Sequence, residues 1–310
     1  MSNASKKLRL GIIGCGAIAE SAHLPAALCC PHVELVALSD LNRTRLDRIE
    51  RWFGLDGVGF TDYRDTFSRV DAVILAVPNA LHASVGGEFL SRGIHVLCEK
   101  PLAVTSAECA LLCEAASKSR TVLAVGYMTR FYPSTRLTKE LIESGFLGPL
   151  ESFDYEFGTS GGWETLSGYN LARATSGGGV FVVSGSHFLD RILYLFGEAD
   201  PLRYVDDCRG GVEANCEASF RVHVHGRVLT CAMRLSKTHS LSNRLRIVGE
   251  AGALEVGEGQ RGSVYFFPAD SGQRHEITHL EMGPNRIEPN YFQEHLEDFL
   301  APSKRVLIPG

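Results

Sequence analysis

LRLGIIGCGAIAE, residues 8–20, decides the fold of the first half of the chain. After Arg9 the first part is apolar, which is typical of a parallel strand covered on both faces. Gly14 and Gly16 then open a G-x-G-x-x-A turn that leads into a helix, the pattern of a dinucleotide-binding turn. Gly14 permits the tight bend, and Gly16 leaves room for a pyrophosphate held by backbone N–H groups and the helix dipole.

A second strand pattern, residues 33–40, ends on an acidic residue. Asp40 lies where a carboxylate accepts the ribose hydroxyls of an adenine dinucleotide, although the same carboxylate can cap the helix expected over residues 41–53. A carboxylate there repels a 2′-phosphate, so the sequence favours NAD. Arg43 and Arg45 leave NADP open, because an arginine just past this strand accommodates that phosphate.

The composition is that of an ordinary globular protein. The chain has 310 residues, of which 45% are hydrophobic and 22% charged, enough for two cores of usual size. Its net charge of −5 and the lack of Lys/Arg clusters argue against nucleic-acid binding. Glu20 and His23 interrupt an N-terminal stretch that imitates a signal peptide, and no uncharged run approaches the roughly 18 residues of a membrane span.

The nine cysteines fit neither a disulfide framework nor a zinc site by their spacing. We therefore expect reduced cysteines in a cytoplasmic protein, and no bound metal. Cys15 lies at the start of the turn helix, where a thiol pKa can fall, although a small residue that fits the turn is the simpler interpretation.

The order of strand and helix patterns predicts two domains. From residue 11 to 125 the two patterns alternate, which predicts an α/β domain with a doubly wound parallel sheet. Later segments alternate in polarity and are joined by short turns, which predicts an α+β domain with a large open-faced, mostly antiparallel sheet. We expect a dinucleotide-binding domain over residues 1–126 and a substrate-binding and oligomerisation domain over residues 127–310. An open sheet face commonly forms a subunit interface, so we expect a homo-oligomer.

Four segments resemble the glucose–fructose oxidoreductase, inositol dehydrogenase and rhizopine-catabolism family, known as Gfo/Idh/MocA. They are GIIGCGAIAESAHLPA, AVPNALHASVGGEFLSRGIHVLCEKPLA, GYMTRFYP and GGGVFVVSGSHFLDRILYLFG. The most specific part is Glu99-Lys100-Pro101, which follows the Pro-Asn-x-x-His that begins at Pro78. The resemblance covers nearly the whole chain.

The resemblance implies a Rossmann domain that binds NAD(P), a second domain whose sheet mediates dimers or tetramers, and hydride transfer at a carbinol carbon of a sugar, cyclitol or related polyol. By the family pattern, Lys100 hydrogen-bonds the reacting hydroxyl and His187 takes or returns its proton. Alcohol oxidation benefits from such a pair, because a base removes the O–H proton while a cation stabilises the developing alkoxide. The resemblance also implies a cis bond between Lys100 and Pro101.

The turn and the resemblance together predict a set of contacts to the cofactor: Gly14, Gly16, Ala17, Ile18, Asp40, Arg45, Pro78, Asn79, His82, Glu99 and Lys100. The residues expected to line a polar or anionic substrate are Lys100, Arg130, Trp163, Tyr169, Arg173 and His187. The chain stops at residues 304–310, where the resemblance implies a further helix that packs on the first domain.

One position departs from the family pattern, which has an aspartate one helical turn before the histidine. Here that position is Val183, and an apolar neighbour should lower the pKa of His187 relative to family members with aspartate. Three alternatives follow: His187 acts alone, another group replaces the aspartate, or the chain has lost catalysis. The alternatives to a dehydrogenase are therefore an NAD(P)-bound sensor or regulator without turnover, and an NAD-dependent glycoside-cleaving enzyme, which would begin with the same hydride removal.

Overall fold

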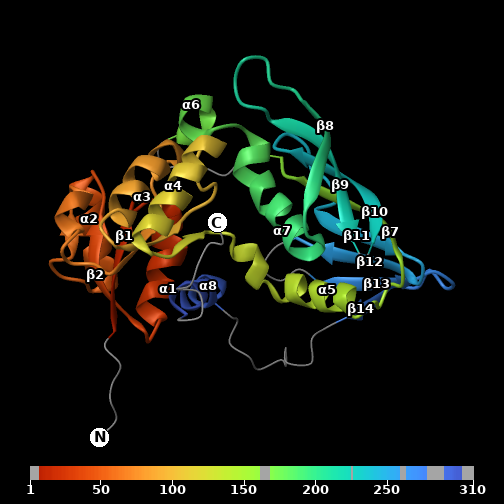
Figure 1. Ribbon diagram of the computed structural model, residues 1–310, viewed down its shortest axis with the longest axis horizontal. Coiled ribbons are helices and arrows are strands. Elements are labelled where there is room, and N and C mark those ends of the chain that lie inside the picture. The colour runs from red at the N-terminus through yellow and green to blue at the C-terminus, as the bar shows by residue number, and fades with distance from the viewer. Residues whose placement is uncertain (1–6, 161–167, 225, 259–262, 278–289, 302–310) are drawn as a thin grey trace, which may run out of the picture.

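Two sheets lie side by side in the computed structural model, each with its own helices (Figure 1). The structure describes residues 7–160, 168–224, 226–258, 263–277 and 290–301. The strands of the first sheet lie within residues 8–125, and those of the second lie within residues 150–277.

The first sheet has six parallel strands in the order β3-β2-β1-β4-β5-β6, which confirms the doubly wound sheet. The strands are β1 (Leu8–Ile13), β2 (Val33–Ser39), β3 (Gly59–Phe60), β4 (Ala72–Leu75), β5 (His95–Cys98) and β6 (Leu123–Val125). The helices are η1 (Ala19–His23), α1 (Leu24–Cys29), α2 (Arg43–Phe53), η2 (Tyr63–Thr66), η3 (Asn79–Leu81), α3 (His82–Leu90) and α4 (Ser106–Ser119).

Both faces of this sheet are buried, which explains the continuous apolar run of its first strand. In β1, Leu10 and Ile12 belong to the hydrophobic cluster on one face, and Ile13 belongs to the cluster on the other. Successive side chains of a strand point to opposite faces, so a strand covered on both sides needs apolar residues at every position.

The second sheet has eight strands in the order β14-β13-β12-β11-β7-β10-β9-β8. Only the pair β7–β10 is parallel among its described neighbours, which confirms the mostly antiparallel sheet. The strands are β7 (Leu150–Gly158), β8 (Ala199–Asp206), β9 (Asn215–Val224), β10 (Arg227–Ser236), β11 (Arg244–Gly249), β12 (Gly252–Gly257), β13 (Val264–Pro268) and β14 (His275–Ile277). The helices are η4 (Met128–Phe131), α5 (Pro133–Glu143), η5 (Tyr169–Leu171), α6 (Arg173–Ser176), η6 (Phe181–Gly185) and α7 (Ser186–Phe196).

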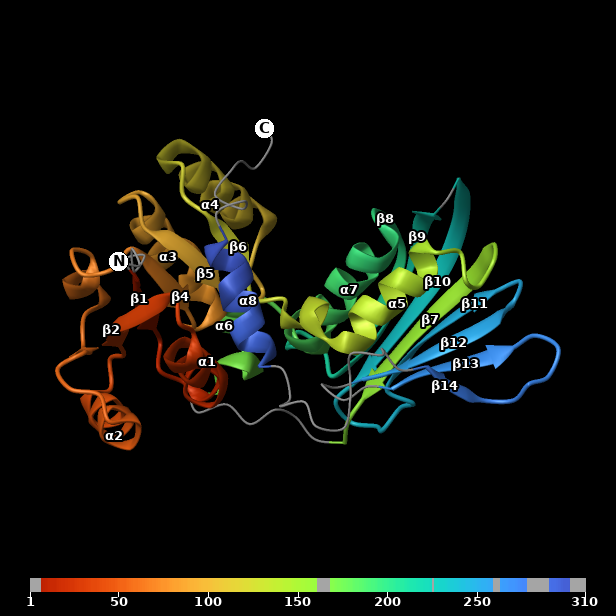
Figure 2. The ribbon, with the colours of Figure 1, turned by 90° about the horizontal axis from the view of Figure 1, so that it is seen from below.

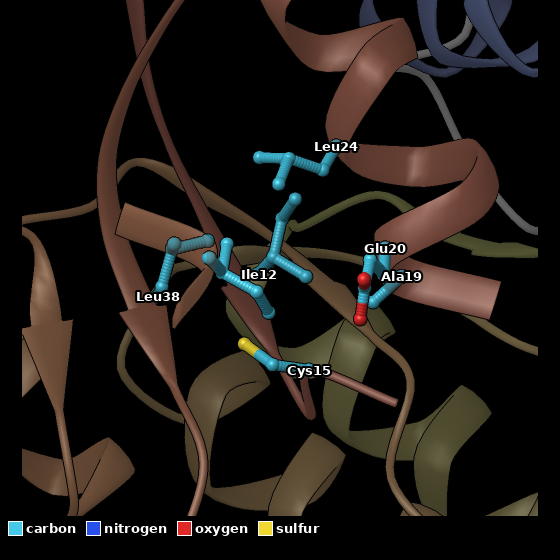
Figure 3. Close-up of a pocket in the computed structure, with 7 residues that line it drawn as sticks. Ile12, Cys15, Ala19, Glu20, Leu24 and Leu38 are labelled. Carbon is cyan, nitrogen blue, oxygen red and sulfur yellow. The ribbon is translucent and has the colours of Figure 1, made fainter. Parts of the chain in front are cut away.

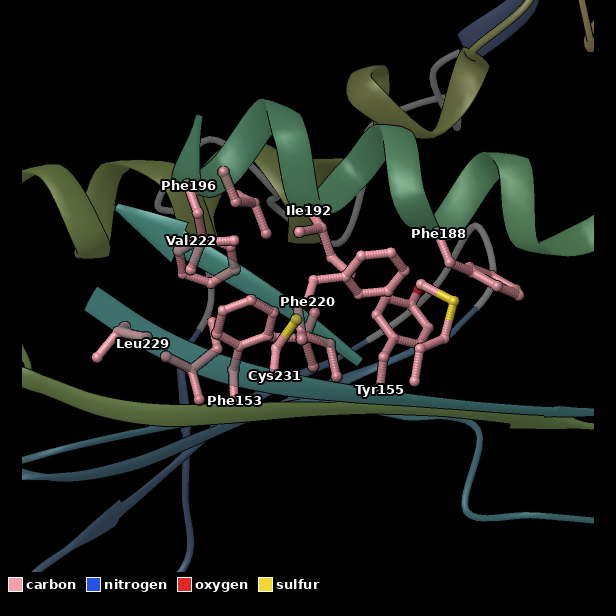
Figure 4. Packing of buried hydrophobic residues seen from close by; sticks show 14 of the residues in the cluster. Phe153, Tyr155, Phe188, Ile192, Phe196, Phe220, Val222, Leu229 and Cys231 are labelled. Atoms are coloured by element: carbon pink, nitrogen blue, oxygen red, sulfur yellow. The ribbon is translucent and has the colours of Figure 1, made fainter. Parts of the chain in front are cut away.

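Helices α5 and α7 lie on one face of the second sheet (Figures 1 and 2). Phe188, Ile192 and Phe196 of α7 point at the aromatic side chains of the strands below (Figure 4). Phe196 stacks on Phe153 with ring centroids 4.2 Å apart. Along β9 and β10 buried and exposed residues alternate, so the opposite face is open, as the sequence predicts.

The stretch Arg173–Phe196 is long and apolar enough to cross a membrane by length and composition alone. Half of its most apolar window is buried, and it covers the second sheet, which is the behaviour of a core helix. Among the described residues it is the one helix that passes this test.

The last described helix, α8 (Tyr291–Leu300), returns to the first sheet (Figure 2). Leu296 and Phe299 pack in the hydrophobic cluster that contains β1 and α1. The division into residues 1–126 and 127–310 stays a prediction, and α8 is the element of the second range that completes the core of the first.

Candidate active site

The dinucleotide-type turn follows β1 and has the shape that its glycines require. Gly14 has φ +92°, and a Cβ atom there would lie 2.4 Å from the carbonyl oxygen of Ala76, so only glycine fits. A Cβ atom at Gly16 would meet no heavy atom within 4 Å. Ala17 and Ile18 begin the helix directly after this open position. The turn therefore leaves space at a helix N-terminus, which fits the pyrophosphate of a dinucleotide.

Cys15 points away from this space, into the core beneath the turn. Its side chain lies near Ile12 and below Leu38 (Figure 3). Burial and the nearby charge of Asp40 raise the pKa of Cys15 to about 12. The hypothesis of an activated thiol is wrong, because the sulfur is turned away from the helix N-terminus and desolvated.

Asp40 is held at the end of β2 by three donors. One carboxylate oxygen accepts from the backbone N–H of Cys15 at 3.0 Å and from Arg45 at 2.9 Å, and the other accepts from the N–H of Asn42 at 2.9 Å. The N-cap of α2 is Asn42, whose side chain accepts from the N–H of Arg45. Asp40 is therefore not the helix cap, and it lies at the turn beside a guanidinium group.

The Pro-Asn-x-x-His segment forms hydrogen bonds to the backbone of the loops around the site. Asn79 is buried next to Pro78 and donates to the carbonyl of Ser176 at 2.9 Å, which ties the first sheet to α6. The two ring nitrogens of His82 lie 2.8 Å from the carbonyl oxygen of Pro101 and 2.9 Å from that of Val77. His82 has 0% exposed surface, so it contributes by holding these loops and has no surface to offer a cofactor.

Glu99 forms a buried pair with His23 at the end of β5. The two side chains are 2.7 Å apart, and the second carboxylate oxygen accepts from the backbone N–H of Lys100 at 3.1 Å. Burial alone would raise the pKa of Glu99, but the hydrogen bond and charge of His23, together with Lys100, lower it to about 2. The carboxylate is thus ionised and already paired.

Lys100 reaches across from the first sheet to the helix of the second. Its Nζ donates to the carbonyl oxygen of Val183 at 2.7 Å. The Lys100–Pro101 bond is cis, as the resemblance implies. Burial lowers the pKa of Lys100; the charge of Glu99 counteracts this, and that of Lys237 adds to it.

The helix that carries Val183 and His187 begins at a carboxylate that binds its first N–H groups, an arrangement called the Glu213 clamp below. The carboxylate of Glu213 accepts from the N–H of Gly179 at 2.8 Å and from that of Phe181 at 3.0 Å. The next turn, η6, has π-helical hydrogen bonding, a feature frequent at functional sites. The apolar pattern of residues 180–197 is typical of a helix and gives no sign of this π turn.

His187 faces the same region as Lys100. Its Nδ1 atom is buried and has no hydrogen-bond partner among the described residues, and the Tyr127 ring lies 6.2 Å away, edge to face. Burial and the charge of Lys100 lower the pKa of His187 to about 3. The imidazole is therefore neutral near pH 7, and the lower pKa relative to family members with aspartate at this position stays a prediction.

The other predicted substrate residues are not all brought to this point. Arg130 binds both carboxylate oxygens of Asp190, at 2.8 and 2.5 Å, so it fixes α7 and is not a free anion ligand. Arg173 is exposed and lines a cavity of about 240 Å³ together with Phe181 and Glu213. Trp163 and the side chain of Tyr169 lie outside the described residues.

Two residues near the site have no local sequence signal. Glu213 lies in the loop before β9, and Lys237 follows β10. Their role becomes visible only when distant strands pair. Among the described residues no group of three or more His, Cys, Asp or Glu side chains is placed to hold a metal ion.

Comparison with known proteins agrees with this geometry. The model of the oxidoreductase family with an NAD-binding Rossmann fold matches residues 8–127, and that of the GFO/IDH/MocA C-terminal domain matches residues 135–255. The chain belongs to the Gfo/Idh/MocA family.

Relatives within the Gfo/Idh/MocA family differ in what their names say they act on. The chain is 30% identical over 201 residues to the rhizopine catabolism protein MocA of Rhizobium meliloti, covering 62% of this chain and 58% of that protein. It is 32% identical over 144 residues to an inositol 2-dehydrogenase of Salmonella typhimurium, covering 46% and 43%. The chain thus spans about half the length of the curated relatives it matches.

Solved structures share the fold over more of the chain. The aldose-aldose oxidoreductase from Caulobacter crescentus, complexed with glycerol, has a TM-score of 0.79 at 25% identity, covering 95% of this chain and 88% of that one. A levoglucosan dehydrogenase in complex with NADH has a TM-score of 0.79 at 20% identity, covering 95% and 89%, which supports the fold alone.

Proposed function

We propose that the protein is an NAD(P)-dependent oxidoreductase that transfers a hydride between the nicotinamide and a hydroxyl-bearing carbon of a sugar, cyclitol or related polyol. The observation that carries this is the 2.7 Å hydrogen bond from Lys100 to Val183. It brings the end of β5, a strand of the sheet that carries the dinucleotide-type turn, together with the helix that bears His187. A cation and a neutral base then lie on the two sides of one site.

Lys100 and His187 have different roles in alcohol oxidation. When bound, a nicotinamide dinucleotide would supply the hydride acceptor for the carbinol carbon. Lys100 donates a hydrogen bond to the reacting oxygen and stabilises its developing negative charge. His187, kept neutral by burial, accepts the hydroxyl proton. In the reverse direction the same two groups polarise the ketone and return the proton.

For the cofactor we propose NAD in preference to NADP, because the Asp40 carboxylate would lie beside a 2′-phosphate. The adjacent Arg45, at 2.9 Å from Asp40, reduces but does not remove this repulsion. All nine cysteines are unpaired, which supports the reducing cytoplasm as the compartment.

The test is a cofactor-reduction screen over sugars, cyclitols and nucleotide sugars, with NAD⁺ and NADP⁺. Lys100→Met and His187→Asn should each lower kcat at least about 100-fold while cofactor binding, measured by calorimetry, is retained. Lys118→Met, at an exposed lysine of α4, should leave turnover unchanged. An active parent whose rate is unaffected by both site variants would contradict the assignment of roles.

A second candidate, a dinucleotide-bound sensor without turnover, is favoured by one observation. Val183 offers only its carbonyl to Lys100, where the family pattern supplies an aspartate to the same site. The sensor is supported instead if NAD binds, a polyol binds beside it, and no substrate of the screen is oxidised. Glycoside cleavage would appear as release of an aglycone without net NADH formation.

A further inference from the structure

His23 is a buried histidine to which the proposed reaction assigns no role. It lies at the end of η1, in the helix that follows the dinucleotide-type turn, and only 2% of its surface is exposed. Its Nε2 atom lies 2.7 Å from the Oε1 atom of Glu99, 76 positions later in the chain. Glu99, with a pKa of about 2, is ionised, so the ring N–H donates and the carboxylate accepts. This hydrogen bond joins the helix of the turn to the end of β5.

The helix that carries His23 contains the same irregularity as the helix that carries His187. The helical run of residues 17–29 has π-type hydrogen bonding over η1, Ala19–His23. The run that leads into α7 has it over η6. Within the part of the chain that the structure describes, these are the two π turns. Such turns are rare and lie frequently at functional sites, so this one indicates a role for His23 independently of its hydrogen bond.

Glu99 connects His23 to Lys100. Its Oε2 atom accepts from the backbone N–H of Lys100 at 3.1 Å, while its Oε1 atom is held by His23. The backbone N–H of Glu99 donates to the carbonyl of Leu75 at 2.9 Å. Gly126 lies against the carboxylate, since a Cβ atom there would be 3.1 Å from both carboxylate oxygens. The carboxylate is therefore fixed between two donors and the backbone of Gly126.

Helix α8 packs against His23. The Phe292 ring meets the His23 ring edge to face, with centroids 5.1 Å apart. Leu296 and Phe299 of the same helix share a hydrophobic cluster with Leu24, the residue after His23. The imidazole is thus held by packing as well as by its hydrogen bond, which is the support that a positioning residue needs.

The titratable groups that act on Glu99 come from several elements. His23, Lys100 and His187 together outweigh burial and lower the pKa of Glu99. Burial lowers the pKa of His295, in α8, to about 4, although the charge of Glu99 counteracts it. His295 and His187, the latter with a pKa of about 3, are therefore neutral near pH 7. Lys100 is then a charged group that Glu99 balances at that pH.

Lys100 depends on Glu99 in two ways. Its backbone N–H is bound by the carboxylate, and its Nζ atom donates to the Val183 carbonyl at 2.7 Å, so Glu99 fixes the point from which the side chain crosses the site. Burial lowers the pKa of Lys100, Glu99 counteracts this, and Lys237 adds to it. Without the His23 N–H, the buried carboxylate loses a donor and rotates or takes up a proton, which weakens both effects.

We propose that His23 is a positioning residue for the oxidoreductase reaction: its ring N–H holds the Glu99 carboxylate, and that carboxylate holds Lys100 where it binds the reacting oxygen. This inference rests on the proposed function. His23 touches no reacting atom and acts through Glu99. Because Lys100 stabilises charge that develops in the transition state, loss of the His23 N–H lowers kcat more than it changes KM.

The experiment compares His23→Leu, which removes the N–H, with His23→Gln, whose side-chain amide can take the place of Nε2. With an active substrate of the screen, His23→Leu should lower kcat about 10- to 100-fold and change KM less than about 3-fold. It should also move the alkaline limb of kcat/KM to lower pH by about 1 unit, because Lys100 must stay protonated and its pKa falls when the ionised neighbour is lost. His23→Gln should restore most of both values.

His95→Leu is the matched control. His95 lies at the start of the same strand, β5, and accepts from the N–H of Val122 at 3.0 Å. This variant should lose stability in thermal unfolding but keep the kcat and the pH profile of the parent. Gly126→Ala leaves His23 in place and pushes against the Glu99 carboxylate, so it should lower kcat as His23→Leu does and serves as the test if His23→Leu does not fold.

A folded His23→Leu or Gly126→Ala protein with the kcat and alkaline limb of the parent would overturn the inference and leave the oxidoreductase function standing. An equal loss of kcat in His23→Leu, His23→Gln and His95→Leu would also overturn it, because it would show a packing role only.

If no polyol is oxidised, the proposed function fails, and the pKa of Lys100 tests the inference by itself. It is measured by NMR titration of protein with ¹⁵N-labelled lysine side chains, in which the signal that disappears in Lys100→Met belongs to Lys100. A lower pKa in His23→Leu than in the parent and in His95→Leu supports the inference, and equal values in all three overturn it.

Discussion

At the scale of single residues, the chemistry of the site depends on what surrounds His187. The valine one turn earlier supplies no negative charge, while Lys100 supplies a positive one, and both circumstances favour the neutral imidazole. A neutral base can accept a proton at any pH above its pKa. The parent should therefore remain active in alcohol oxidation well into the acidic range, as far as His187 controls it.

Val183→Asp should raise the pKa of His187 and move the acidic limb of kcat/KM for alcohol oxidation to higher pH, by about 1–3 units. The sign follows because an aspartate stabilises imidazolium, and the protonated ring cannot act as the base. Val183→Asn is the matched control, since it adds a polar group of the same size without the charge. An unchanged acidic limb in the aspartate variant would show that another group sets it.

Asp40 and Arg45 form the second residue-scale determinant, because they lie at the turn as a pair. Asp40→Ser removes the carboxylate and frees the guanidinium group for a 2′-phosphate, so NADP affinity relative to NAD should rise at least about 10-fold. Titration of both cofactors measures it. Asp47→Ser, at an exposed carboxylate of α2 that pairs with Arg43, should leave the ratio unchanged. A constant ratio in both variants would mean that Asp40 does not face the ribose.

At the scale of elements, the glycine-rich start of the long helix is explained by one contact. A Cβ atom at Gly179 would lie 1.9 Å from the carbonyl oxygen of Glu213, so the backbone of the loop before β9 occupies the place of a side chain. This close approach lets the Glu213 carboxylate reach the first N–H groups of the helix. The clamp thereby sets where Val183 and His187 stand relative to Lys100.

Gly179→Ala should lower the free energy of unfolding by about 1–3 kcal/mol and reduce turnover, because the helix start must move away from Glu213. Urea unfolding and the kinetics of the screen substrate measure the two effects. Gly87→Ala is the control: it lies within α3, its Cβ atom would meet nothing within 4 Å, and helix propensity should make it neutral or slightly stabilising. A Gly179→Ala protein as stable and active as the parent would contradict the clamp.

At the scale of the whole molecule, the second sheet leaves one face uncovered. Along β10, Leu229, Cys231 and Met233 are buried under the helices, whereas Thr230 and Ala232 are exposed on the other side. A broad sheet face of this kind is suited to pairing with a second copy, and we propose a homodimer or homotetramer formed through it.

Ala232→Arg should convert such an oligomer to monomers, since it places a bulky charge in the middle of the open face. The monomer should stay folded, because the cross-strand neighbour of residue 232 on β7 is Asp154, an opposite charge. Light scattering after size-exclusion chromatography measures the mass, and Ser117→Arg, on exposed α4, is the control. A parent that is monomeric at micromolar concentration would contradict the proposal.

The sequence by itself determined the local elements and the type of both sheets. The glycine turn of residues 14–16, the apolar run of β1 and the alternation of β9 and β10 are periodic patterns that the chain carries over a few residues, and each led to the observed element. The apolar pattern of β5 also predicted that Lys100 lies at the end of a strand. The ends of parallel strands meet at one edge of a sheet, so Lys100 lies at the same edge as the glycine turn.

Only the tertiary structure decided which charged side chains pair with one another. Arg130 was expected to bind substrate, but packing placed Asp190, 60 positions later, within its reach. Lys237 has no local sequence signal, yet its charge lowers the pKa of Lys100. The two lysines follow strands of different sheets, β10 and β5, so their interaction depends on how the two sheets pack. The physical reason is that hydrogen-bonding and charge partners are chosen by the packing of whole elements, over separations that no local pattern records.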